Sequence, residues 1–293
     1  MEPDRIIFVE HPVLRQPDMV AAFLGWPDAA QVSTGTVSYI IDQLSAVKLA
    51  EMKSDDYYDF AAVRPTVTIE HGVMQPLSMP LNRFYYWINP GGERDLILFT
   101  GIEPQMKWHA YVEAIADLAG YYNVHRLYSI GGLYDRIPHT RETRISGLVN
   151  NTELLEVLES YQIEPSNSQG PSSIHGLLLS VFAIRRIHAL SLWGHVPFYI
   201  RAESNPMVCF EMIKKLSSVL GIDVSLAEIK KSSNHLYSIL NRLLSENEQM
   251  RHFLKTLEDQ YDEEGSVFGT DVSSDDQIIR DVEEFLRNQR QDE

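Results

Sequence analysis

The first two thirds of the chain alternate short apolar runs with longer amphipathic stretches, and this alternation limits the fold more than any other feature. A helix on a core needs an apolar stripe, whereas a buried strand needs only a short apolar run. Chains that switch repeatedly between the two patterns form α/β proteins, in which helices cover a sheet. Strands are predicted over residues 5–10, 19–26, 66–72, 84–89, 95–102, 125–132 and 189–200.

Two of these runs also predict where their strands lie in the sheet. The run from Leu96 to Phe99 is apolar at every position, so we predict a central strand buried on both faces. Residues 66–69 alternate, which is typical of an edge strand or a strand with one buried face. Helices are predicted over residues 33–52, 107–122, 152–161, 173–188 and 206–220. The apolar stripe of the first comprises Val37, Ile40, Ile41, Leu44 and Val47.

After Gly221 the pattern changes to a seven-residue repeat, which is typical of a coiled coil. Ser225 and Glu228 form a predicted capping box before it. Asn247, at a seam position, is the kind of polar residue that fixes the register. The alternative is that this helix, or two shorter ones, packs on its own domain. The seam comprises Ile229, Ser233, Leu236, Leu240, Leu243, Asn247, Met250, Leu254, Leu257 and Tyr261.

The C-terminal part is strongly acidic. Residues 258–293 hold thirteen acidic residues and three arginines, a net charge of −10. Such a segment repels phosphate backbones, so no nucleic-acid partner is expected. A last amphipathic helix carries Ile278, Ile279, Val282, Phe285 and Leu286, with Ser274 and Gln277 as a second predicted capping box. We therefore expect an α/β domain over residues 1–222, a helical extension over 223–264, and an acidic linker with a terminal helix over 265–293.

Cysteine content and hydropathy predict the compartment. Cys209 is the single cysteine, so an internal disulfide is excluded and a reducing compartment is favoured. The start of the sequence shows no signal-peptide pattern. The longest apolar segment, residues 176–184, is much shorter than a membrane span. We expect a cytoplasmic protein with no membrane partner.

Motifs that bind phosphates, dinucleotides or zinc are absent. The sequence contains no GxxxxGK[ST], GxGxxG, HExxH or GxSxG, and its ten histidines show no HxH or HxxxH spacing. The sequence therefore predicts no cofactor and no metal site.

Polar residues nevertheless follow several predicted strands. Asp28, in GWPDAA, lies between a strand and the first helix, at the edge where α/β folds place ligands. It is a candidate base, or a carboxylate that accepts amides at the helix start. Glu103 follows the most apolar strand, and Trp108 lies shortly inside the next helix. Glu103 is a candidate catalytic carboxylate or an ion-pair partner of Arg141, and such a pair would make it a poor proton donor.

The segment SIGGLYDRIPHTRETR, residues 129–144, is the most polar of these loops. His139 is a candidate proton shuttle, and the Arg141 guanidinium suits a carboxylate or phosphate. The alternative is a braced corner in which Arg141 pairs with Glu103 and His139 is hydrogen-bonded beneath. His195, in WGHVPFY, adds a polar group to the same edge or packs within it. Because no nucleophile–base pair is evident, we predict a braced loop rather than a reactive one.

The order and spacing of six short motifs resemble the proteasome assembly chaperone type 2 family. The motifs are GWPDAA, YYDF with RP, GIEP with Trp108, PHTR, GPSS and WGHVPFY, spread over about residues 5 to 220. The resemblance implies a three-layer α/β/α sandwich, similar to nucleoside-phosphorylase-like folds, with a mixed and largely parallel sheet. It also implies a helical C-terminal extension and homo-oligomers. Eukaryotic members of the family are chaperones that assemble the proteasome α-ring.

Two functions follow from these observations. The first is a non-enzymatic assembly chaperone or scaffold that works as a homo-oligomer, a trimer being one option, through apolar helix faces and with a protein client. The seam over residues 229–261 and the missing catalytic constellation favour it. The alternative is an enzyme or sensor that binds a small anionic or nucleoside-like ligand at the carboxyl edge of the sheet. Its candidate contacts are Asp28, Glu103, Trp108, His139, Arg141 and His195.

Overall fold

A mixed sheet forms the centre of the computed structural model, which describes residues 5–264 and 276–291. Its strands are β1 (Ile6–Phe8), β2 (Asp18–Leu24), β3 (Val47–Met52), β6 (Asn82–Trp87), β7 (Leu96–Ile102), β8 (Arg126–Asp135), β9 (Ile145–Val149), β10 (Glu164–Pro165) and β11 (His188–Pro197). They lie in the order β1-β3-β6-β7-β2-β8-β11-β9-β10. The central strands β7, β2, β8 and β11 run parallel, while β1, β3 and β6 pair antiparallel on one side.

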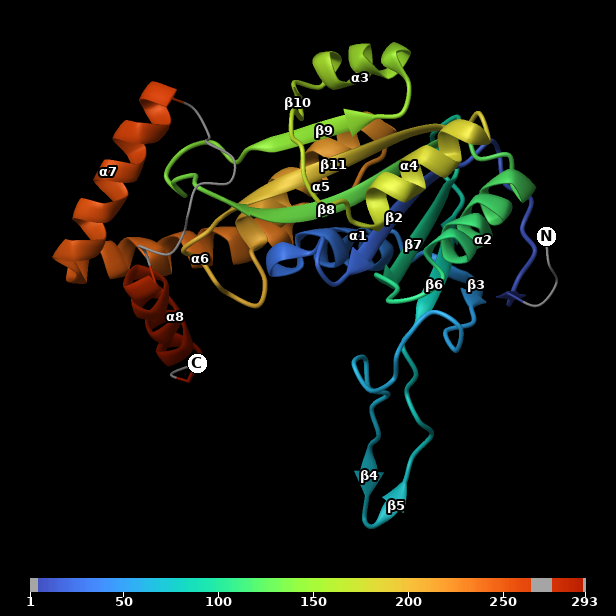
Figure 1. The fold of residues 1–293 in the computed structure, drawn as a ribbon, viewed down its shortest axis with the longest axis horizontal. Helices are drawn as coiled ribbons and strands as arrows, with labels where there is room; N and C mark the ends of the chain where they lie inside the picture. Colours follow the sequence, from blue (N-terminus) through green and yellow to red (C-terminus); the bar gives the residue numbers. More distant parts are fainter. Residues whose placement is uncertain (1–4, 265–275, 292–293) are drawn as a thin grey trace.

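Helices cover both faces of this sheet (Figure 1). The cluster on one face includes α2 (Trp108–Tyr121) and α4 (Ile174–Ile184), and the cluster on the other includes α1 (Val32–Gln43) and α5 (Pro206–Leu220). Alternate residues of β7 supply the two clusters, with Phe99 on the α2 side and Leu98 on the α1 side. Both are fully buried, as predicted for a central strand. The predicted three-layer α/β/α sandwich with a largely parallel core is confirmed.

The secondary structure differs from the sequence prediction at two places in the sheet. The helix predicted over residues 33–52 ends at Gln43, and its last part is strand β3. The turn between them contains Ser45, whose φ of 50° is left-handed, and β3 then pairs with β1 and β6. Strand β9 was not predicted, although it pairs with β11 along five residues. Shorter helical turns lie at η1 (Ala29–Gln31), η2 (Thr152–Leu154) and α3 (Leu155–Ser160).

A β-hairpin projects far from the body of the molecule (Figure 1). It consists of β4 (Ile69–Glu70) and β5 (Val73–Met74), which form a separate two-stranded sheet. A further bridge joins Thr66 to Ser78, and we call residues 64–80 the arm. The sequence predicted β-structure here, at the edge of the sheet. The strands instead leave the sheet altogether, so their apolar side chains do not reach the core.

The C-terminal part folds back onto the α/β domain as α6 (Ala227–Glu246), α7 (Glu248–Glu264) and α8 (Asp276–Gln291). The helix breaks at Asn247, whose side-chain oxygen accepts the Met250 amide and so starts α7. The predicted continuous seam is therefore wrong, and the alternative of two shorter helices is confirmed. Most seam residues lie in a third apolar cluster with Phe198 and Ile200. None of the helices described is long and apolar enough to cross a membrane.

Of the two predicted capping boxes, only the first lies fully within the described residues. The first is wrong, because the N-cap residue of α6 is Leu226 and not Ser225, and the Ile229 amide donates instead to the Tyr39 hydroxyl at 3.4 Å. In the second, Ser274 and the side chain of Gln277 lie outside the described residues.

Candidate functional site

The polar loops predicted to share one edge of the sheet do follow parallel neighbouring strands. Because β7, β2, β8 and β11 run in the same direction, their carboxyl ends meet at a single edge. The loops after β2 and β7 approach closely at Gly25, where an added Cβ would lie 3.3 Å from the Cβ of Glu103. Gly25 also has a φ of 128°, which only glycine adopts without strain.

Asp28 binds the start of α1. Its carboxylate accepts the amide hydrogens of Ser33, at 2.7 Å, and Thr34, at 3.2 Å, and the Thr34 hydroxyl at 2.5 Å. Burial raises the pKa of Asp28 against the opposing effect of these bonds. The structure thus shows the amide-accepting alternative from the sequence, while one side of the residue still faces a cavity.

Glu103 binds a different helix. Its carboxylate accepts the amide hydrogen of Ile174, the first residue of α4, at 2.8 Å. Burial raises the pKa of Glu103, while bonds from the Ile174 and Trp26 amides lower it. Trp108 donates its indole hydrogen to the carbonyl oxygen of Pro104 at 2.6 Å. Both side chains therefore brace the junction of β7 with α2 and α4.

His139 is buried beneath Tyr199. Its amide donates to the Tyr199 hydroxyl oxygen at 2.8 Å, and its Nδ1 lies 2.7 Å from the same oxygen. The Nδ1 atom and the Tyr199 hydroxyl therefore share one hydrogen bond. Desolvation lowers the pKa of His139 to about 4, so the ring is neutral near pH 7. A neutral, enclosed imidazole is poorly placed to shuttle protons to solvent.

Arg141 is held by α7 and not by Glu103. Its guanidinium donates to both carboxylate oxygens of Asp262, at 2.9 and 2.6 Å, and lies 3.3 Å from Glu258. Thr140 donates its hydroxyl to Glu258 at 2.5 Å. The bond to Asp262 is the main cause of the raised pKa of Arg141. The predicted Arg141–Glu103 ion pair is therefore wrong, and the C-terminal extension supplies the brace.

His195 lies at the centre of a buried hydrogen-bond chain. Its Nδ1 is 2.7 Å from the Asp135 carboxylate, and its Nε2 is 2.8 Å from the Ser146 hydroxyl. Ser166 donates to Ser146 at 3.1 Å, and Arg144 pairs with Asp135 at 3.4 Å. Neither Ser146 nor Ser166 was among the predicted site residues, because β9, the strand that carries Ser146, was not predicted.

The predicted residues thus follow strands that end at one edge, but no cavity described here is lined by all six. His139, Arg141 and His195 border a crevice of about 10 Å³, which is about the volume that one water needs. No group of three or more His, Cys, Asp or Glu side chains within residues 5–264 and 276–291 could hold a metal ion.

A cavity of about 780 Å³ opens beside Asp28, and we call it the β2–α4 pocket. It is lined by the loop after β2, by β8 and β11, and by the start of α4. Besides Asp28, its lining includes Trp26, Ser166, His175 and Trp193. Of the six predicted site residues only Asp28 lines it. The motifs GWPDAA and GPSS both supply lining residues, so they were the sequence signals for this pocket.

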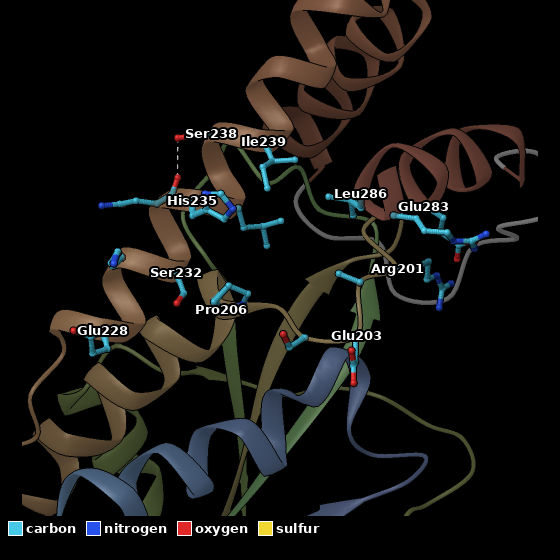
Figure 2. A pocket seen from close by; sticks show the side chains of 16 residues that line it. Arg201, Glu203, Pro206, Glu228, Ser232, His235, Ser238, Ile239, Glu283 and Leu286 are labelled. Atoms are coloured by element: carbon cyan, nitrogen blue, oxygen red, sulfur yellow. Dashed lines mark hydrogen bonds between the residues drawn. The ribbon is translucent and has the colours of Figure 1, made fainter. Parts of the chain in front are cut away.

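A second cavity of about 930 Å³ lies between α6, α8 and the segment after β11 (Figure 2). Its lining mixes both signs of charge, with Arg201 and Arg287 beside Glu203, Glu228 and Glu283. None of the six predicted residues lines it, and the helical extension forms it together with the loop that follows β11.

Replacing Arg141 with alanine is expected to loosen α7 without unfolding the sandwich. The Arg141 guanidinium is the main polar contact between α7 and the PHTR loop, residues 138–141. Amide hydrogen exchange in residues 250–262 should accelerate about two- to fivefold, the factor that a surface ion pair supplies. Exchange in α1 and α5 should not change. Lys255→Ala removes a charge of α7 that pairs with Asp259 in the same helix, and it is the matched control. Unfolding of the whole protein by Arg141→Ala would contradict this assignment.

Comparison with known proteins agrees with this architecture. The model of the PAC2 family matches residues 22–244. A PAC2 family protein from Streptomyces avermitilis is 28% identical, with a TM-score of 0.73 over 78% of this chain and 95% of that one. A proteasome-assembly chaperone homologue from Mycobacterium tuberculosis is 25% identical, with a TM-score of 0.74 over 80% of this chain and 99% of that one.

A Corynebacterium glutamicum protein of unknown function shows the same fold, with a TM-score of 0.80, 19% identity and coverage of 89% of this chain and 98% of that one. No significant match is found among curated proteins. The family model covers most of the chain, and the sandwich, its loops and its motifs agree with it. The chain therefore belongs to the PAC2 family.

Proposed function

We propose that the protein is a non-enzymatic, chaperone-like scaffold that self-associates and binds other protein chains. The arm is the observation that carries the proposal, because it exposes apolar side chains far from the core. Membership of the PAC2 family, and likeness to a relative described as a proteasome-assembly chaperone homologue, support a role in assembling other proteins. The buried, unpaired thiol of Cys209 fits a cytoplasmic protein.

The arm has the physical properties of an unoccupied contact surface. Ile69, Val73 and Met74 have exposed fractions of 65%, 62% and 66%. An isolated two-stranded hairpin is marginally stable in water, and its unpaired edges can take up another strand. Contiguous exposed apolar side chains on a folded protein mark places where another chain binds. A protein partner that covers the arm would stabilise both its backbone and its apolar surface.

We now assign self-association to the arm, whereas the sequence pattern had indicated the apolar faces of the C-terminal helices. Leu240, Met250 and Leu254 are at most 5% exposed, because α6, α7 and α8 bury them against one another and the segment after β11. The seam therefore has little apolar surface left for a second copy. The enzyme alternative has less support, since Glu103, His139 and Arg141 all bind other protein groups.

Charging the arm is expected to separate the oligomer into monomers. Ile69 and Met74 lie opposite each other in the hairpin, so the double variant Ile69→Asp, Met74→Asp places two carboxylates on its apolar surface. Light scattering coupled to size-exclusion chromatography, at micromolar concentration, should show multiples of the chain mass for the unmodified protein and one chain mass for the variant.

Glu70→Gln changes an exposed polar residue of the same hairpin and should leave the mass unchanged. Thermal unfolding of all three proteins should agree closely, because the arm contributes nothing to the core. A monomeric unmodified protein would refute self-association. An oligomer that persists in the double variant would refute the arm as its contact.

A further inference from the structure

The β2–α4 pocket has the size and position of a small-molecule site, and the proposed scaffold role does not explain it. Its volume of about 780 Å³ lies within the range of pockets that bind small organic ligands. It lies at the carboxyl ends of the parallel strands β2, β8 and β11. Open α/β sheets bind ligands at that edge.

The loop that forms one wall of the pocket contains strained backbone. Ala30 and Gln31, between β2 and α1, follow one another with φ values of 47° and 52°, in the left-handed region that residues with a side chain rarely adopt. Ala30 itself lines the pocket. Strained backbone persists only where the surrounding structure holds it, and it clusters at sites that bind ligands. A wall shaped for a ligand would account for this strain.

The lining of the pocket has one negative charge and no positive one. Asp28 is the sole acidic residue among the described residues that line it, and none of them is a lysine or an arginine. His175 also lines the pocket, but burial lowers the pKa of its ring to about 3, so it is neutral near pH 7. An anionic ligand would therefore be repelled by Asp28 without a compensating cation, whereas a cationic ligand would be attracted.

The Asp28 carboxylate has hydrogen-bond donors but no cationic partner. It accepts from the amides of Ser33 and Thr34 and from the Thr34 hydroxyl. Within residues 5–264 and 276–291, no lysine, arginine or histidine pairs with it. The positive end of the α1 dipole offsets only part of its charge. Because Asp28 is only 7% exposed, and buried carboxylates are usually paired, a cation in the adjoining pocket would supply the missing charge.

Aromatic rings supply a second attraction for a cation. Trp26 lines the pocket although it is 68% exposed, so its indole ring is open to a ligand. Trp193 and Tyr134 line the same cavity and are half-buried. Tyr134 already binds a cation, since the Arg201 guanidinium lies 3.8 Å from the centre of its ring. Indole rings attract cations more strongly than phenol rings do, and the two tryptophans remain for a ligand.

We propose that the β2–α4 pocket binds a small organic cation with a quaternary ammonium group, which stacks on Trp26 and is attracted by Asp28. Such a group carries one positive charge and no N–H donor. It therefore suits a pocket with one carboxylate whose oxygens already accept hydrogen bonds. Its methyl groups contact the indole face, while its charge interacts with the electrons of the ring.

Isothermal titration calorimetry on the full-length protein tests the proposal with tetramethylammonium, choline and tetraethylammonium. Each cation is used at up to about 10 mM, which detects dissociation constants into the millimolar range, and sodium chloride keeps the ionic strength constant. At least one of the three should bind. Neohexanol, the uncharged carbon analogue of choline, has the same shape and should bind at least about tenfold more weakly than choline.

The same ammonium group also occurs on trimethylated lysine in protein chains. Trimethyl-lysine with an acetylated amino group and an amidated carboxyl group carries the same single charge as choline. The ratio of the two dissociation constants therefore shows whether the pocket prefers a free metabolite or a modified protein chain.

Variants of the two residues separate the effect of the charge from that of the ring. Asp28→Asn keeps an oxygen that can accept the α1 amides, and it should weaken binding about tenfold. Trp26→Leu keeps apolar surface but removes the aromatic face, and it should weaken binding about five- to thirtyfold, whereas Trp26→Phe should restore part of the loss. Asp259→Asn, the same change at an exposed residue of α7, is the matched control and should bind normally.

The proposal is refuted if none of the three cations binds, if neohexanol binds as tightly as choline, or if either Asp28→Asn or Trp26→Leu binds as the unmodified protein does. If Asp28→Asn fails to fold, Trp26→Leu still decides, because that side chain is exposed. Light scattering of Trp26→Leu distinguishes this proposal from the scaffold role, because the pocket variant should retain the oligomeric mass that the arm variant loses.

Discussion

Between about pH 7 and pH 5, the buried histidines His139 and His175 are together expected to reduce the free energy of unfolding by about 4 kcal/mol. Burial lowers the pKa of His139 to about 4 and that of His175 to about 3, against 6.5 for an unperturbed histidine. Below pH 6.5 the unfolded chain therefore binds protons that the folded protein does not. The contribution of these histidines to the free energy of unfolding is fully present above pH 6.5. It is lost as the pH falls towards 4, at about 1.4 kcal/mol per pH unit for each histidine.

Chemical denaturation of histidine variants isolates this effect. Asp28 and Glu103 have raised pKa values, so they bind protons more readily when folded and partly offset the loss. His175→Gln should remove about half of the histidine contribution to the slope of stability against pH, whatever its effect on stability at pH 7. His109→Gln, at an exposed position of α2, should leave the slope unchanged. Equal slopes in His175→Gln and the unmodified protein would contradict the prediction.

Asp135→Ala is expected to destabilise the protein by about 3–5 kcal/mol, the range for breaking a buried ion pair by removing one partner. The carboxylate is 5% exposed and accepts from His195, from the Arg136 amide at 2.8 Å and from Arg144. Its loss leaves the fully buried His195 without the acceptor that orients the chain to Ser146.

Equilibrium unfolding in urea measures this loss, and two variants bracket it. Asp135→Asn keeps the shape and one acceptor, so its stability should fall between that of Asp135→Ala and the unmodified protein. Asp56→Ala removes an exposed carboxylate that pairs with Lys107, and it should leave the midpoint unchanged. If Asp135→Ala unfolded at the same urea concentration as Asp56→Ala, the buried network would have no role in stability.

The sequence predicted the parts of the fold that depend on local pattern. The run from Leu96 to Phe99 is a central strand, because four successive apolar side chains have to be buried on both faces. The helix predicted over residues 33–52 failed at Val47, which continues the apolar spacing of α1 but belongs to β3. Pairing with β1 and β6 decides that segment, and strand pairing over long separations leaves no local signal.

The sequence predicted at which edge of the sheet the candidate residues lie, but not which groups they contact. Asp28, Glu103 and His139 all follow parallel strands, so their shared edge followed from topology. Each then binds an amide or a hydroxyl of the same domain, and Arg141 binds an acidic helix more than a hundred residues away in sequence. Which partner a charged side chain takes depends on the path of the C-terminal helices, which no motif in the loop describes.

The attachment of α7 to the PHTR loop also has a consequence for the order of folding. Arg141 and Asp262 are separated by 121 residues, so this contact closes one of the long loops in the chain. Closing such a loop costs entropy before any contact repays it, and a ribosome releases the acidic helix only after the whole sandwich has been synthesised. The segment that carries the PHTR motif therefore reaches its final surroundings only after the sandwich has been synthesised.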